Sequence, residues 1–145
     1  MNERMKAVVQ GEDICVLATT ADGVPHCSLM AYITDASCTN LCMVTHRSTQ
    51  KYLNLLANPE VCVLVDSRRV DGDRGRGSIK ALSVKGTATL IEDASDRARV
   101  VREFISAHRH LADFARHPEA VFFMVHIKTL QLLDGATEAT YETLI

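Results

Sequence analysis

Short β-rich runs separated by turn-length polar breaks constrain the fold of this chain more than any other feature. Residues 14–20 and 26–34 are two such runs, and the stretch between them contains Asp22-Gly23. A turn signal of this kind between two β-rich runs predicts an antiparallel hairpin. After a polar break at residues 35–40, the run at 41–44 is expected to continue the antiparallel meander as a third strand.

Helical periodicity occurs in three places along the chain. Residues 2–10 begin at a capping candidate, Asn2, and space their apolar side chains along one helix face. A second periodic stretch begins at Ser48 and ends at Asn58-Pro59, because proline and its restricted neighbour stop a helix. Residues 94–116 carry the third pattern, in one or two pieces. These few helices are expected to cover the ends of a sheet.

Further β-rich runs complete the expected sheet, at residues 61–65, 79–91, 120–127 and 130–133, and a polar tail follows them. Residues 68–78 are rich in glycine and arginine without an apolar period, and they predict a loop that is either a basic lid or simply solvated. Sequential antiparallel strands with short connections favour a barrel or a sandwich over a doubly wound sheet. The expected class is a β-rich α+β fold, in a single domain over residues 1–145.

Composition narrows the classes of function. The formal net charge is -2, and no stretch resembles a signal peptide or a membrane span, so a soluble cytoplasmic protein without membrane or nucleic-acid partners is expected. The five cysteines contain no CxxC pair and predict reduced, mostly buried thiols. His108, His110 and His117 share a helical region but not one face, so we interpret them as surface histidines and expect no metal site.

The segment at residues 45–51 joins the end of a strand to the start of a helix, and that junction suits a phosphate. Free backbone N–H groups at a helix N-terminus carry a partial positive charge. Ser48 and Thr49 add hydroxyl donors there, while Arg47 and Lys51 add positive charge. A simpler role fits equally well, in which a hydroxyl only caps the helix and the basic side chains are solvated. Spacing alone leaves both roles open.

A longer series of motifs places this junction in context. In chain order the series is Leu17-Ala-Thr, Asp22-Gly-x-Pro-His26, Ser28, Thr45, Lys51 and Asn58-Pro59-x-Val61. It resembles the FMN-binding split-barrel family named for pyridoxamine 5'-phosphate oxidase. The resemblance covers residues 14 to about 91 and implies an antiparallel split β-barrel with helices over its ends. It also implies a homodimer, because that family builds each flavin site from two chains.

The resemblance implies roles for individual residues. The FMN phosphate would be held by the strand-end threonine and by the helix start, and the backbone of the second strand would lie along the flavin ring. A lysine before the long strand, beside the place where the family has a glutamine contributed across the dimer, could reach an anion. The implied cofactor-binding residues are Ser28, Leu29, Met30, Thr45, Arg47, Ser48, Thr49, Gln50, Lys51 and Lys80.

The chain departs from the family pattern at several of these places. Gln50 stands where the family often has an arginine, and Cys27 and Tyr32 stand where the oxidases carry an arginine and a lysine that contact FMN. The family's cross-dimer glutamine would fall near Ala81, and the C-terminus has no arginine-rich substrate site. The resemblance is therefore to small relatives, some of which bind FMN and others a deazaflavin or heme, and not to the oxidase itself.

The function expected from these patterns is that of an FMN-dependent oxidoreductase acting on a small-molecule redox substrate. No catalytic side chain is assigned, because the flavin can move hydride or electrons itself. A different class remains open, a non-enzymatic flavin or heme carrier or sensor on the same barrel. A third alternative is a relative with an empty site, in which the helix start is only a cap.

Overall fold

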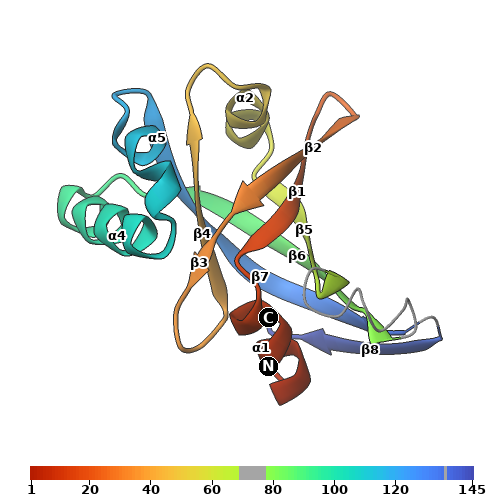
Figure 1. The fold of residues 1–145 in the computed structure, drawn as a ribbon. Coiled ribbons are helices and arrows are strands. Elements are labelled where there is room, and N and C mark those ends of the chain that lie inside the picture. The colour runs from red at the N-terminus through yellow and green to blue at the C-terminus, as the bar shows by residue number, and fades with distance from the viewer. Residues whose placement is uncertain (69–77, 136) are drawn as a thin grey trace.

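The computed structural model describes residues 1–68, 78–135 and 137–145, and a curled antiparallel sheet forms its main body (Figure 1). The strand order is β2-β1-β5-β6-β7-β4-β3, and β8 pairs with β7 off this path. The expected β-rich α+β split barrel is confirmed. The strands are β1 (Ile14–Ala21), β2 (Val24–Ala31), β3 (Ile33–Thr34), β4 (Asn40–His46), β5 (Glu60–Asp66), β6 (Lys80–Leu90), β7 (Ala120–Asp134) and β8 (Glu138–Thr143).

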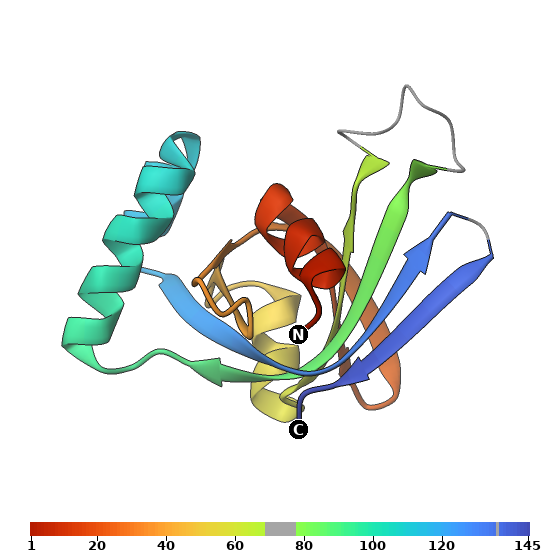
Figure 2. The ribbon, with the colours of Figure 1, turned by 90° about the horizontal axis from the view of Figure 1, so that it is seen from below.

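Helices lie at the ends and at one side of this sheet. Figure 2 shows α1 at the open end of the curled sheet and α4 set to one side. The helix α1 inserts Met5, Val8 and Val9 into the main core, as its periodicity predicts, and Asn2 caps it. The helices and the short 3-10 turn are α1 (Glu3–Gly11), α2 (Gln50–Ala57), α4 (Ala94–Ala107), η3 (Arg109–Leu111) and α5 (Ala112–Arg116).

The hairpin between β1 and β2 turns at the two residues that the sequence indicates. Asp22 and Gly23 have φ angles of 52° and 76°, and Ala21 pairs directly with Val24. Two successive positive φ angles match the right-handed twist of the flanking strands, and glycine and aspartate tolerate them best. The predicted hairpin is therefore confirmed, with a two-residue turn.

The expected meander is wrong at its third strand. Residues 41–44 belong to β4, which pairs with β3 and β7, whereas β2 has β1 as its ladder partner among the described strands. The chain leaves β2 at Tyr32 and crosses to the far end of the strand order. This crossing leaves β2 without a second ladder partner in the described part of the chain, at the edge that lies near β4, and it produces the split in the barrel.

Three hydrogen bonds fix Tyr32 at this crossing. Its N–H donates to the Asp13 carbonyl at 3.0 Å, and its buried hydroxyl donates to the Val9 carbonyl at 2.6 Å. Its own carbonyl accepts from His108 Nε2 at 2.9 Å. His108 is thus a buried structural residue, which corrects its interpretation as a surface histidine, whereas His110 and His117 are exposed. The helical pattern alone did not show that His108 ends α4 against a buried carbonyl.

The C-terminal region also differs from expectation. The two strands predicted at 120–127 and 130–133 form one strand, β7, and residues 138–143 of the expected polar tail form β8. The half-buried Lys128 and Thr129 interrupt the apolar pattern of β7, and Lys128 is also skipped in the pairing with β6, but β7 continues as one strand on both sides of it. β8 carries few apolar side chains because it lies at a sheet edge with most of its side chains exposed, and its ladder to β7 holds it there.

A β-bulge between Lys85 and Gly86 lets β6 and β7 bend around the core. Position 86 at this bulge has no room for a side chain, so glycine is required there. A Cβ atom there would lie 2.5 Å from the His126 carbonyl oxygen and 2.9 Å from Val125 Cγ1. Neither the backbone oxygen nor the fully buried valine can move away easily.

We therefore predict that Gly86→Ala lowers the free energy of unfolding by about 2 kcal/mol, because overpacking forces a backbone shift. Urea unfolding followed by circular dichroism measures the change. Gly11→Ala is the matched control, since nothing lies within 4 Å of its new methyl group. Equal stabilities of the two variants would show that the bulge has more room than the structure indicates.

Candidate functional site

The junction between β4 and α2 is braced by two threonines. Thr49 is the N-cap of α2, and its hydroxyl accepts from the Tyr52 N–H at 3.3 Å and donates to the His46 carbonyl at 2.8 Å. Thr45 is fully buried, and its hydroxyl lies 2.9 Å from that of Thr49. Since the single hydrogen of Thr49 goes to His46, Thr45 is the donor in this pair. Both hydroxyl hydrogens are therefore used within the junction.

Donors for an anion remain at the start of α2. The first-turn N–H groups of Gln50 and Lys51 have no acceptor within the helix, and Ser48 beside them is exposed. The Gln50 side chain points along the helix instead, because its Nε2 donates to Asn54 Oδ1 at 2.9 Å. Asn54 in turn donates to Thr19 Oγ1 at 3.1 Å, and these two hydrogen bonds connect α2 to β1.

Lys51 is the charged group of this site. Its ammonium donates to Met30 Sδ at 3.4 Å, and it forms no ion pair with any carboxylate in the described part of the chain. Partial burial lowers the pKa of Lys51 below its ordinary value. A thioether is a weak acceptor and does not balance a positive charge. The arrangement therefore favours an anionic ligand at the Lys51 ammonium.

Lys51 lines an apolar pocket of about 170 Å³ between β2 and the helices of the other side. The pocket brings together Leu29, Met30 and Lys51, three of the residues expected at the site. Its opposite wall comes from α4, η3 and α5 and was missed from the sequence, because apolar residues at helical spacing indicate core packing. The remaining lining residues are Ala31, Val44, Phe104, Leu111 and Phe114.

Other expected site residues lie near this pocket without lining it. Ser28 is on β2, where its hydroxyl lies 3.4 Å from His26 Nδ1. Leu29, the next residue, is 74% exposed and continues the pocket toward the outer surface of the sheet. The predicted roles of Ser28, Ser48, Thr45, Thr49 and Gln50 toward a cofactor stay predictions.

Arg47 and Lys80 lie in other pockets. Arg47 donates from Nη1 to the Pro118 carbonyl at 3.1 Å and lines a separate pocket near the start of α4. Lys80 lines a third pocket with Arg4 and Ser67 beside α1. Lys51 is thus the basic residue among those that line its pocket. Because Lys80 lines a different pocket, a contact of Lys80 with the same cofactor would require a second chain.

The remaining expectations concern cysteines, the basic loop and membranes. Cys15, Cys38 and Cys42 are buried, and burial raises the pKa of Cys15 and Cys42 to about 12, whereas Cys27 and Cys62 are exposed. The predicted loop at 68–78 lies outside the described residues except at its ends. In the described ranges, no helix combines the length and apolarity needed to cross a membrane.

The described residues thus form a split barrel with a lysine ammonium in an apolar pocket beside the edge of β2. The sequence matches the pyridoxamine 5'-phosphate oxidase family over residues 1–134, and the chain belongs to this family. No protein of curated function gave a significant sequence match.

Solved structures confirm the fold. A heme binding protein from Mycobacterium smegmatis is 14% identical with a TM-score of 0.84, and the match covers 97% of this chain and 57% of that protein. A FAD-binding protein from Mesorhizobium loti is 21% identical, with a TM-score of 0.73 and coverage of 91% and 94%. HutZ, the heme storage protein from Vibrio cholerae, is 18% identical, with a TM-score of 0.74 and coverage of 91% and 92%. Flavin and heme binding thus both occur among proteins with this fold.

The burial of Lys51 has a consequence for stability. An amine whose pKa is lower in the folded protein binds fewer protons there than in the unfolded chain. The charged amine therefore destabilises the fold. This destabilisation is complete below the folded-state pKa of Lys51 and disappears as the pH rises to 10.5, the ordinary pKa of a lysine. We predict that Lys51→Met raises the free energy of unfolding of the ligand-free protein at neutral pH. The gain should shrink in alkaline buffer.

Urea unfolding at neutral and at alkaline pH measures the change in the free energy of unfolding. Lys6→Met on α1 is the control for removing a lysine charge. A Lys51→Met variant less stable than the wild type at neutral pH would contradict the view that the pocket leaves the ammonium unbalanced.

Proposed function

We propose that this protein is an FMN-binding oxidoreductase that holds the cofactor phosphate at the start of α2. The observation that carries the proposal is the half-buried Lys51 ammonium, which faces an apolar pocket and, among the residues that the structure describes, has only Met30 Sδ as its partner. The N–H groups of Gln50 and Lys51 and the Ser48 hydroxyl add donors at the same helix end. An anion there would balance the charge that burial makes unfavourable.

The size of the pocket indicates which part of FMN it takes. A pocket of about 170 Å³ is smaller than the ~300–1,000 Å³ typical of sites that enclose a whole ligand. It suits a phosphate end and the adjoining chain of FMN. The free edge of β2 offers unpaired backbone N–H and C=O groups, which complement the donors and acceptors at the edge of a flavin ring. Ser28, Leu29 and Met30 lie on this strand.

FMN bound in this way would supply the redox chemistry. The chain contributes binding and orientation, and its apolar walls, including Phe104 and Phe114, exclude water from part of the site. We assign no side chain as a proton donor or acceptor. The substrate is proposed to be a small molecule, and the protein is proposed to act in the cytoplasm.

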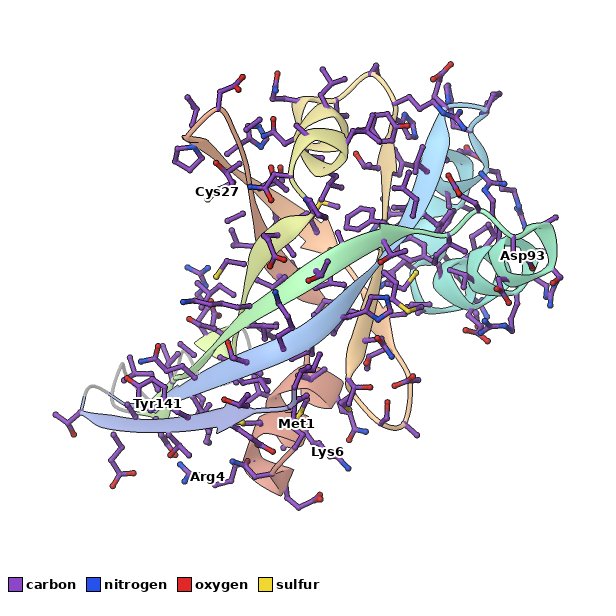
Figure 3. All side chains as sticks on the ribbon, turned by 180° about the vertical axis from the view of Figure 1, so that it is seen from behind. Met1, Arg4, Lys6, Cys27, Asp93 and Tyr141 are labelled. Carbon is purple, nitrogen blue, oxygen red and sulfur yellow. The ribbon has the colours of Figure 1, made fainter. Side chains whose placement is uncertain are left out.

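We further propose that the site is completed in a homodimer. On the outer face of the sheet, Ala18 of β1 pairs with Cys27 of β2 and Cys62 of β5, and both cysteines are exposed. In the next row, Val16 lies between Leu29 and Leu64. Figure 3 shows Cys27 at the outer side of the β1–β2 hairpin. Both rows are uncharged across β2, β1 and β5, and the exposed Lys85 of β6 stands beside Cys62 at the end of the first row. The uncharged part of this open sheet face is suited to covering by a second copy, and Leu29 extends from it to the Lys51 pocket.

The dimer proposal predicts that Ala18→Arg produces monomers, because it introduces an unpaired charge at the centre of this face. Sedimentation velocity of the wild type and the variant measures the change. The control is Ala98→Arg, at an exposed position on α4. A dimer that persists in Ala18→Arg would show that the chains associate through another surface.

Heme is the second candidate, since two proteins of this fold are named for heme. The observation that favours it is a ring stack next to the pocket. His46 lies 3.9 Å from the Phe114 ring and 4.6 Å from the His117 ring, measured between centroids. Histidine is a common ligand of heme iron, so imidazoles beside an apolar wall are compatible with heme binding. The absorption spectrum of the purified protein separates the candidates, since flavin and heme absorb at different wavelengths.

Titration with FMN tests the site itself. Wild type is expected to quench FMN fluorescence, and Lys51→Gln is expected to weaken binding by about tenfold or more, because it removes a charge-assisted contact. Lys6→Gln should bind as the wild type does. Unchanged affinity in Lys51→Gln would contradict the assigned phosphate position. Bleaching of bound FMN by a reduced nicotinamide would support turnover, and its failure would favour a carrier.

A further inference from the structure

A second pocket lies on the other side of the β4–α2 junction. It has a volume of about 260 Å³ and is lined at its polar side by Arg47, Tyr52 and Arg97 and at its apolar side by Leu90 and Ile91. Arg97 belongs to the first turn of α4, whose N-cap Asp93 is labelled in Figure 3. The pocket shares no lining residue with the Lys51 pocket. Arg47 and Lys51 thus diverge from one junction into separate sites.

Backbone carbonyls hold the two guanidinium groups in place. Arg47 Nη1 donates to the Pro118 carbonyl at 3.1 Å, and Arg97 Nη2 donates to the Ala120 carbonyl at 3.0 Å. The Arg47 N–H also donates to the Glu119 carbonyl at 3.0 Å, so consecutive residues of one short segment position both arginines. Each guanidinium has five N–H donors, so most of them remain for a ligand.

The charges of these arginines are not balanced within the described residues. Neither forms an ion pair there, whereas Arg4, Arg68 and Arg99 each contact a carboxylate. Glu92 also lines the pocket but forms no ion pair with either arginine. Arg97 lies over the Phe122 ring, 5.8 Å from its centroid, and this contact fixes the plane of its guanidinium without neutralising it.

We propose that Arg47 and Arg97 form a binding site for a small oxyanion, a carboxylate or a phosphate monoester, attached to an apolar group. Two guanidinium groups offer the forked donors that planar or tetrahedral oxyanions accept in pairs. The Tyr52 hydroxyl can donate to the same group, and Leu90 and Ile91 provide the surface for its apolar part. This site is separate from the proposed FMN phosphate site, and it does not depend on FMN binding.

The test is a titration of the protein, residues 1–145, with benzoate and with phenyl phosphate, followed by NMR of the arginine Nε–Hε groups and the backbone amides. Binding should shift the signals of Arg47 and Arg97. Arg97→Gln should weaken binding by about tenfold, as expected for loss of hydrogen bonds to a charged group. Arg99→Gln, on the same helix but paired with Asp96 and Glu103, is the control and should leave binding unchanged. The relative affinities of the two probes distinguish a carboxylate from a phosphate ligand.

Three results would overturn the proposal: no binding of either probe at millimolar concentration, wild-type affinity in Arg97→Gln, or equal loss in Arg99→Gln. If Arg97→Gln unfolds as the wild type does, its loss of probe binding comes from the site and not from a change in the fold. Arg47→Gln provides the second variant if Arg97→Gln fails to fold. Titration after addition of FMN separates the two sites. Retained probe binding supports separate pockets, and competition between FMN and the probes contradicts them.

Discussion

The burial of Tyr32 is the constraint on which the site depends. The chain leaves β2 at this residue, and its N–H, carbonyl and hydroxyl are all bonded, to the Asp13 carbonyl, His108 and the Val9 carbonyl. These bonds connect the crossing to α1 on one side and to the end of α4 on the other. Because the chain crosses here instead of continuing a meander, β2 keeps a free edge and faces the helices across a narrow pocket.

The distribution of charge around α2 follows from this geometry. The two threonines of the junction use their hydroxyl hydrogens internally, and Gln50 is engaged with Asn54, so these side chains fix the start of the helix. Lys51 enters the apolar space beside β2, whereas Arg47 is drawn to the Pro118 carbonyl on the opposite side. One basic segment thereby serves two pockets.

Much of the fold could be predicted from the sequence, because local signals dominate it. The Asp22-Gly23 turn, the Asn2 cap and the stop at Pro59 act within a few residues, and the pattern of motifs indicated the family. Strand order was less accessible, since nothing local shows that residues 41–44 pair with β7. The burial of His108 and the aromatic wall at Phe104 and Phe114 also depend on contacts between distant segments. The placement of Lys51 apart from Arg47 and Lys80 required the three-dimensional structure.

We propose that the Lys51 pocket receives the phosphate of FMN. A crystal structure of the protein grown with FMN tests it most directly. We expect density for the phosphate within hydrogen-bonding distance of Lys51 Nζ and the first N–H groups of α2, with the flavin ring along the edge of β2. FMN with its phosphate between Arg47 and Arg97 and no phosphate at Lys51, or FMN bound away from β2, would contradict it.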